Sequence, residues 1–295
     1  MLLESLIGKM IASLFSVSFK FFDTTVNIGD LSGSIEALMG LGFTNSGTYG
    51  SLWGMGSTLY NILQPIALSL LTLFFIMDLF TLMRDVNQIT WERVVMKAIK
   101  GIAVYAVITN LRYLLTALIA IVRGVYNSRT MITGGSGSST ISLADAIQAA
   151  FNPLSLMEEI VGMVVMFFLF AAYIGTAIAA VVSVFQRFIR LIFLYGISPI
   201  PVALLSFAPT AQAGKRFFQV FIATLFEAVL IYVLLQIYNL GLSGLSSVTG
   251  GSGVLTGIPE IIGFGLSISV YNALLTGGIS LCSSMAREAV GATAF

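Results

Sequence analysis

Three ionisable residues interrupt otherwise apolar stretches of the chain: Asp78, Arg112 and Glu227. A charge at bilayer depth costs about 3 kcal/mol or more unless it is paired or faces water, so such residues are candidates for function. Arg112 and Glu227 each fall near the middle of an apolar stretch. We therefore hypothesise that they form a structural ion pair or share a polar cavity. Asp78 lies close to Arg84 in sequence, which favours an interfacial location for Asp78.

Composition excludes most other kinds of site. The chain has no histidine and one cysteine, Cys282, so zinc sites, Cys/His or Ser/His nucleophile pairs and disulfides are not expected. The sequence Gly-Lys-Arg at 214–216 lacks the upstream glycine and the following hydroxyl of a phosphate-binding loop. We therefore predict no enzymatic activity, no catalytic residue, no metal and no cofactor. Energy for any transport process must come from a partner or a gradient.

The elements that position these residues are predicted to be membrane helices. Of the 295 residues, 57% are hydrophobic and 9% are charged, whereas about a quarter of the residues in a soluble domain are charged. The chain is thus predicted to be all-α, a polytopic membrane protein with about five transmembrane helices. Apolar stretches of sufficient length place these helices at residues 60–83, from about 91 to 122, 160–186, 217–240 and 259–287.

Four regions follow along the chain. We predict an amphipathic helix and polar external region over residues 1–58, the first two spans over 59–122, an external Gly/Ser-containing loop over 123–159, and the remaining spans over 160–295. Lys9, Ser13, Ser16 and Lys20 recur at helical spacing over residues 1–22, which indicates a helix lying in the membrane interface. A poor first transmembrane span is the alternative. Short helices are expected near residues 34–41 and after Ser142.

Pro199 and Pro201 break the segment 187–216. Each proline removes a backbone donor and clashes with the preceding turn. The break leaves two apolar arms, at 191–198 and 202–207, each only about 10 Å long. We interpret the segment as a re-entrant hairpin or a broken helix.

Basic residues give the orientation. With five crossings, nine basic residues share one face and four share the other, whereas six crossings give six against seven. The five-crossing topology obeys the positive-inside rule and places the amino terminus and the 123–159 loop outside and the carboxy terminus in the cytoplasm. The nine residues are Arg84, Arg93, Lys97, Lys100, Arg187, Arg190, Lys215, Arg216 and Arg287.

Small residues recur at every fourth position of the third span: Ala171, Gly175, Ala179 and Ser183. Such a stripe lets another helix approach closely. We interpret it as a helix-packing surface rather than as a site of direct function.

The order of features resembles the TrbL-like conjugal-transfer family, the polytopic membrane subunits of type IV secretion and conjugation systems. The resemblance rests on the Trp-Glu-Arg helix start at 91–93, Val-Ile-Thr-Asn at 107–110, Gly-Ile-Ser-Pro-Ile-Pro-Val-Ala-Leu at 196–204 and Ala-Gly-Lys-Arg-Phe-Phe-Gln-Val-Phe at 213–221. It covers roughly residues 55–290 and is most specific over 187–240.

The resemblance implies a channel or scaffold subunit in the cytoplasmic membrane, present in several copies, in a machine that moves single-stranded DNA or protein. It implies other secretion subunits as partners, including secretion ATPases, with membrane lipid and transported single-stranded DNA as further contacts. Two alternatives stay open. One is a small-solute or ion transporter or channel, and the other is a membrane scaffold without a conduit role.

Overall fold

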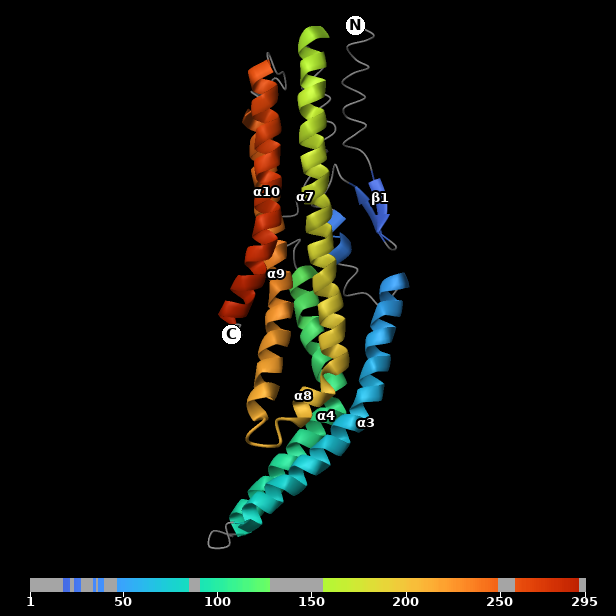
Figure 1. Ribbon diagram of the computed structural model, residues 1–295, viewed down its shortest axis with the longest axis vertical. Helices are drawn as coiled ribbons and strands as arrows, with labels where there is room; N and C mark the ends of the chain where they lie inside the picture. The colour runs from blue at the N-terminus through green and yellow to red at the C-terminus, as the bar shows by residue number, and fades with distance from the viewer. Residues whose placement is uncertain are drawn as a thin grey trace. The chain divides into compact units, whose positions relative to one another are not determined.

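The computed structural model describes residues 18–21, 24–27, 34–35, 37–39, 47–84, 91–127, 156–248 and 258–291, and this part of the chain is mostly helical (Figure 1). In chain order its elements are β1 (Ser18–Phe21), β2 (Thr24–Asn27), α3 (Gly47–Arg84), α4 (Trp91–Asn127), α7 (Leu156–Ile197), α8 (Pro199–Ala203), α9 (Ala211–Val248) and α10 (Ile258–Ala289).

Five of the described helices are long and apolar enough to cross a membrane, as predicted. The candidate spans are Gly50–Met83, Trp91–Gly124, Phe170–Ile197, Ala211–Tyr238 and Gly265–Ala289. Their backbone donors and acceptors are satisfied within each helix, which is the requirement for crossing hydrocarbon. The chain is thus a multi-pass helical membrane protein.

Several helix boundaries differ from the prediction. The first helix begins at Gly47, so part of the region expected to be polar and external belongs to α3. Residues 241–248, expected in a turn, continue α9. Glycine and serine are weak helix formers on their own, but packing overrides propensity when they lie beside large side chains. Gly56 shows this, because a Cβ placed there would lie 2.9 Å from the Ile192 side chain.

The amino-terminal region contains a short antiparallel hairpin. Strand β1 pairs with β2 so that Phe19 lies opposite Val26. Aromatic and β-branched residues favour this pairing, so the interfacial helix predicted over residues 1–22 is wrong for Ser18–Phe21, and its earlier part lies outside the described residues. Residues 34–35 and 37–39 are helical, which confirms the short helix expected there. The helix expected after Ser142 lies outside the described residues.

Residues Pro199 and Pro201 follow the end of α7 and open the five-residue helix α8. Proline is tolerated at the first helical position, where its missing donor has no intrahelical partner in any case. The break is therefore at the predicted place. The arm expected at 191–198 is not a separate segment, however, because residues 187–197 continue α7 without interruption. Re-entry into the membrane stays a prediction.

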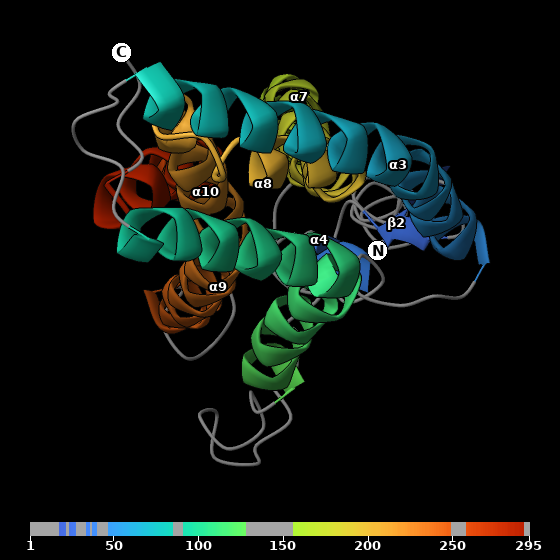
Figure 2. The same cartoon turned by 90° about the horizontal axis from the view of Figure 1, so that it is seen from below.

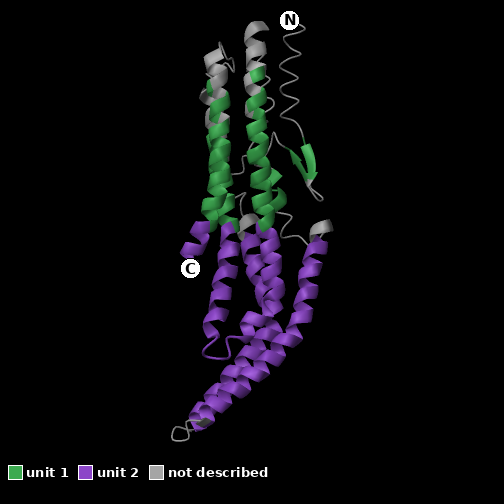
Figure 3. Cartoon of the chain, viewed as in Figure 1, with its two compact units in different colours: residues 1–42, 126–186, 228–283 green, residues 43–125, 187–227, 284–295 purple. Residues whose placement is uncertain are grey.

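The chain divides into two compact units, which Figure 3 colours separately. Unit 1 consists of residues 1–42, 126–186 and 228–283, and unit 2 of residues 43–125, 187–227 and 284–295. Within unit 1, Asn272 of α10 donates from Nδ2 to Thr176 Oγ1 of α7 at 2.7 Å. A polar contact between two apolar helices fixes their register, because the alternative is an unsatisfied amide in hydrocarbon.

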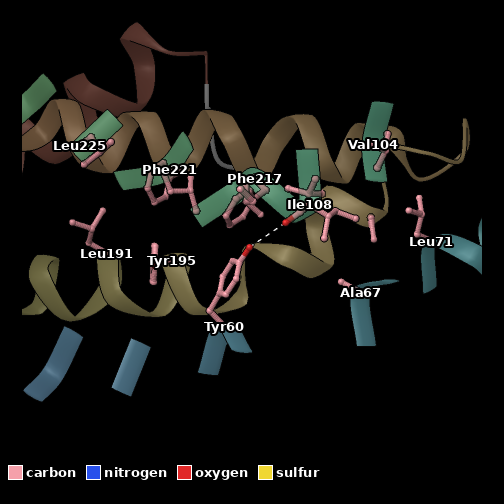
Figure 4. Close-up of a cluster of buried hydrophobic side chains, with 14 residues drawn as sticks. Tyr60, Ala67, Leu71, Val104, Ile108, Leu191, Tyr195, Phe217, Phe221 and Leu225 are labelled. Atoms are coloured by element: carbon pink, nitrogen blue, oxygen red, sulfur yellow. Dashed lines mark hydrogen bonds between the residues drawn. The ribbon is translucent and has the colours of Figure 1, made fainter. Parts of the chain in front are cut away.

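Unit 2 has a core to which α3, α4, α7, α8 and α9 all contribute (Figure 4). The Tyr60 hydroxyl donates to the carbonyl oxygen of Ile108 at 3.1 Å and so ties α3 to α4. Helix α8 packs against α3 (Figure 2), and its Val202 and Ala203 are completely buried. The proline turn is therefore part of the core. The buried members are Tyr60, Ala67, Leu71, Val104, Ile108, Leu111, Leu115, Leu191, Tyr195, Val202, Ala203, Phe217, Phe221 and Leu225.

Candidate functional site

Glu227 lies at the centre of a cluster of charged residues in unit 2. It stands on α9, and its side chain is only 8% exposed. It interacts electrostatically with Arg187 and Arg190 of α7 and with Arg287 of α10. Three cations thus act electrostatically on one buried carboxylate. A buried carboxylate is tolerable only with such compensation, and the cluster retains an excess of positive charge.

Arg112 has different partners. It is exposed on α4, and its side chain interacts electrostatically with Tyr195 of α7. Tyr195 stacks on Tyr60 with ring centroids 5.8 Å apart, and its ring lies edge-on to Trp53 at 5.6 Å. Trp53 also meets Phe188 at 6.1 Å. Arg112 therefore interacts with one member of an aromatic cluster.

The hypothesised contact between Arg112 and Glu227 is not formed. Both residues belong to unit 2, but in the described part of the chain no ion pair joins Arg112 to any carboxylate. The equal depth inferred from their positions along two helices does not fix which faces of the helices meet. A shared functional role for the two residues stays a hypothesis.

Asp78 pairs with Lys97 across α3 and α4. The Lys97 Nζ lies 3.0 Å from the Asp78 Oδ1 and also donates to the Asp78 carbonyl oxygen at 2.9 Å. The two side chains are 16% and 28% exposed, Asp78 being the more buried. This bridge joins α3 to α4. The sequence did not indicate Lys97 as the partner.

The bridge between Asp78 and Lys97 is expected to contribute about 1 kcal/mol of coupling, the upper end for partly exposed pairs. A double-mutant cycle with Asp78→Asn and Lys97→Met, followed by denaturant unfolding in detergent, measures this coupling. The charge-reversed pair Asp78→Lys with Lys97→Asp should recover part of the loss. Lys100→Met, combined with Asp78→Asn, is the control and should show no coupling. Equal coupling for Lys97 and Lys100 would contradict the assignment.

The predicted small-residue stripe faces outward. Ala171, Gly175, Ala179 and Ser183 are all exposed, and a Cβ added at Gly175 would meet nothing within 4 Å. Helix α7 instead buries an adjacent face that includes Tyr173, Ala177, Ala180 and Val184. Close approach of another helix to the stripe stays a prediction.

All nine basic residues that the five-crossing topology assigns to one face belong to unit 2, together with Arg112 and Arg123. Within the residues that the structure describes, no group of three or more histidines, cysteines, aspartates or glutamates could hold a metal ion.

Residues 71–276 match the TrbL/VirB6 plasmid conjugal transfer protein family. The chain belongs to this family. The match covers well over half of the chain and includes α4, α7, α8 and α9, with Asp78, Arg112 and Glu227. It confirms the resemblance noted in the sequence. The TrbL/VirB6 proteins are structural membrane components of transfer systems. Neither the curated proteins nor the solved structures contain a match to this member.

The partners of Glu227 were missed by sequence reasoning. Arg187 and Arg190 are three positions apart and so share one face of α7, a signal that marks them as a pair. Nothing in the sequence indicates that Arg287, near the end of the last helix, joins them. The sequence also gave no indication that Tyr195 contacts Arg112.

Proposed function

We propose that this TrbL/VirB6 family member is an integral membrane channel or scaffold subunit of a type IV secretion machine that moves DNA, protein or both across the cytoplasmic membrane. Several copies assemble with the other secretion subunits, and the secretion ATPases supply energy. The amino terminus lies outside and the carboxy terminus lies in the cytoplasm.

The family match over residues 71–276 carries the proposal, because it includes three of the five candidate spans completely and part of the other two. The charge distribution supports it. Arg187, Arg190 and Arg287 all act electrostatically on Glu227, so this cluster holds three cations and one carboxylate. A positive field attracts an anionic polymer and repels most cations.

Deletion of the gene from a donor strain tests the proposal. Transfer frequency should fall to background and return when the wild-type chain is supplied in trans. The transferred strand should also be recovered with the protein after crosslinking in mating cells. A deletion strain that transfers DNA at the normal frequency would refute the conjugative role. Loss of transfer without crosslinking would instead favour a scaffold that does not touch DNA.

A further inference from the structure

The middle of α4 carries an exposed polar face. Tyr105, Thr109, Arg112, Tyr113 and Thr116 are all exposed, and their spacing of i, i+4, i+7, i+8 and i+11 places them on one side of the helix. We call these five residues the α4 polar face. Its neighbour on one side is the buried face, with Val104, Ile108, Leu111 and Leu115.

The α4 polar face lies at mid-membrane depth. Lys100 and Arg123 bound residues 101–122, and Arg112 is the one charged residue between them. In a helix this stretch is about 33 Å long, close to the thickness of the hydrocarbon core. Arg112 lies at its centre. The two bounding cations are placed where long basic side chains reach the two interfaces.

Contact with lipid does not suit this face. The Thr109 and Thr116 hydroxyls donate to carbonyl oxygens of their own helix, which lowers their cost in hydrocarbon. The cost of placing Arg112 in hydrocarbon is not lowered in this way, because its side chain interacts with a tyrosine and with no carboxylate within the described structure. An arginine at this depth almost always faces the protein interior or water. By contrast, another exposed side of α4 presents Ile99, Leu114 and Ile121, which suit lipid. Asn110 lies among them, and its amide donates to the Ala106 carbonyl oxygen.

A water-free contact between the α4 polar faces of two copies of the chain is also unfavourable. A two-fold contact brings the same patch of both copies together. Two Arg112 side chains would then meet without a carboxylate between them. A ring of copies with the face directed inward keeps each guanidinium hydrated, and rings of arginine line pores that pass anions.

We propose that the α4 polar face borders a water-filled passage in the assembled protein, with Arg112 setting a positive potential along it. This inference rests on the proposed function, because the passage requires several copies in a membrane. It goes further by naming α4 as the lining element and the charge that the passage favours.

Cysteine accessibility in membranes from cells that carry the complete machine tests this inference. In a Cys282→Ala background, single cysteines replace Thr109 and Thr116 on the face, and Leu114 and Ile121 on the apolar side as matched controls. The probe is methanethiosulfonate ethylsulfonate, which is anionic and reacts with thiolates in water. The face positions should react at least about tenfold faster than the controls, because an apolar environment suppresses the thiolate.

The effect of Arg112 is tested at the Thr116→Cys position. When each rate is divided by the rate of the same reagent with a free thiol in solution, the anionic reagent should react faster there than its cationic trimethylammonium counterpart. Arg112→Gln should abolish that preference and Arg112→Lys should retain it. If the anionic reagent labelled the polar face and the apolar side of α4 at equal rates, whether fast or slow, the inference would be overturned. It would also be overturned if Thr116→Cys formed disulfides between copies but did not react with the reagent. Normal labelling with undiminished transfer after deletion would instead refute the proposed function alone.

Discussion

Replacing Glu227 with glutamine is expected to destabilise unit 2 by about 3 kcal/mol or more and to abolish transfer. The substitution keeps the size of the side chain but removes the negative charge that Arg187, Arg190 and Arg287 face. Removing one partner of a buried charge cluster costs about 3 to 5 kcal/mol because the remaining charges are left uncompensated. Denaturant unfolding in detergent and the level of protein in membranes measure the stability, and mating frequency measures the function.

Two further variants make this expectation specific to the cluster. Glu288→Gln changes an exposed carboxylate beside Arg287 and should leave stability and transfer near those of the wild type. Adding Arg287→Gln to Glu227→Gln should recover part of the lost stability, since it removes one uncompensated cation. The cluster would have no structural importance if Glu227→Gln matched the wild type in membrane protein level, in unfolding free energy and in transfer frequency.

The second large effect is expected at Gly214, in the first turn of α9. A Cβ there would lie 2.6 Å from the Pro201 carbonyl oxygen and 2.6 Å from Leu205 Cγ. The side chain could move aside, but the backbone oxygen belongs to the proline turn and cannot do so cheaply. Gly214→Ala should therefore destabilise the protein by about 1 to 3 kcal/mol, the cost of overpacking a core. Unfolding in detergent and membrane protein levels provide the measurement.

Gly54→Ala is the matched control, because it lies in a helix of the same unit and an added Cβ meets nothing within 4 Å. Alanine is the better helix former, so this variant should be as stable as the wild type or more stable by up to about 1 kcal/mol. If Gly214→Ala and Gly54→Ala had the same stability, the close packing of the proline turn against α9 would not explain why glycine is needed at position 214.

The sequence was sufficient to predict the helical architecture. Long apolar stretches separated by charged or Gly/Ser-rich segments indicate membrane helices, and all five are present. Pro199 and Pro201 marked the main break correctly. The extent of α7 could not be predicted in the same way. Arg187 and Arg190 suggested a membrane boundary, yet a charged residue does not end a helix unless the backbone hydrogen bonding also ends.

The site residues were identified as candidates, but their partners were not. Arg112 and Glu227 were found because a charge within an apolar span is conspicuous. Which side chains they meet depends on the rotation of each helix about its axis, and nearly uniform apolar sequence gives little information about rotation. Helix α9 illustrates this, since Glu227 stands among large apolar residues such as Phe226 and Leu225. Partner choice thus emerges only from the packed helices.

The aromatic contacts of Trp53 make the chain suitable for fluorescence spectroscopy. The protein has two tryptophans, and they occupy opposite environments. Trp53 lies between Phe188 and Tyr195 in the cluster that holds Arg112, whereas Trp91 at the start of α4 is 83% exposed. A Trp91→Phe chain would carry a single tryptophan, which lies beside the α3 and α7 contact. The wavelength and quenching of its emission would then follow the packing around Arg112 during assembly, without an attached dye.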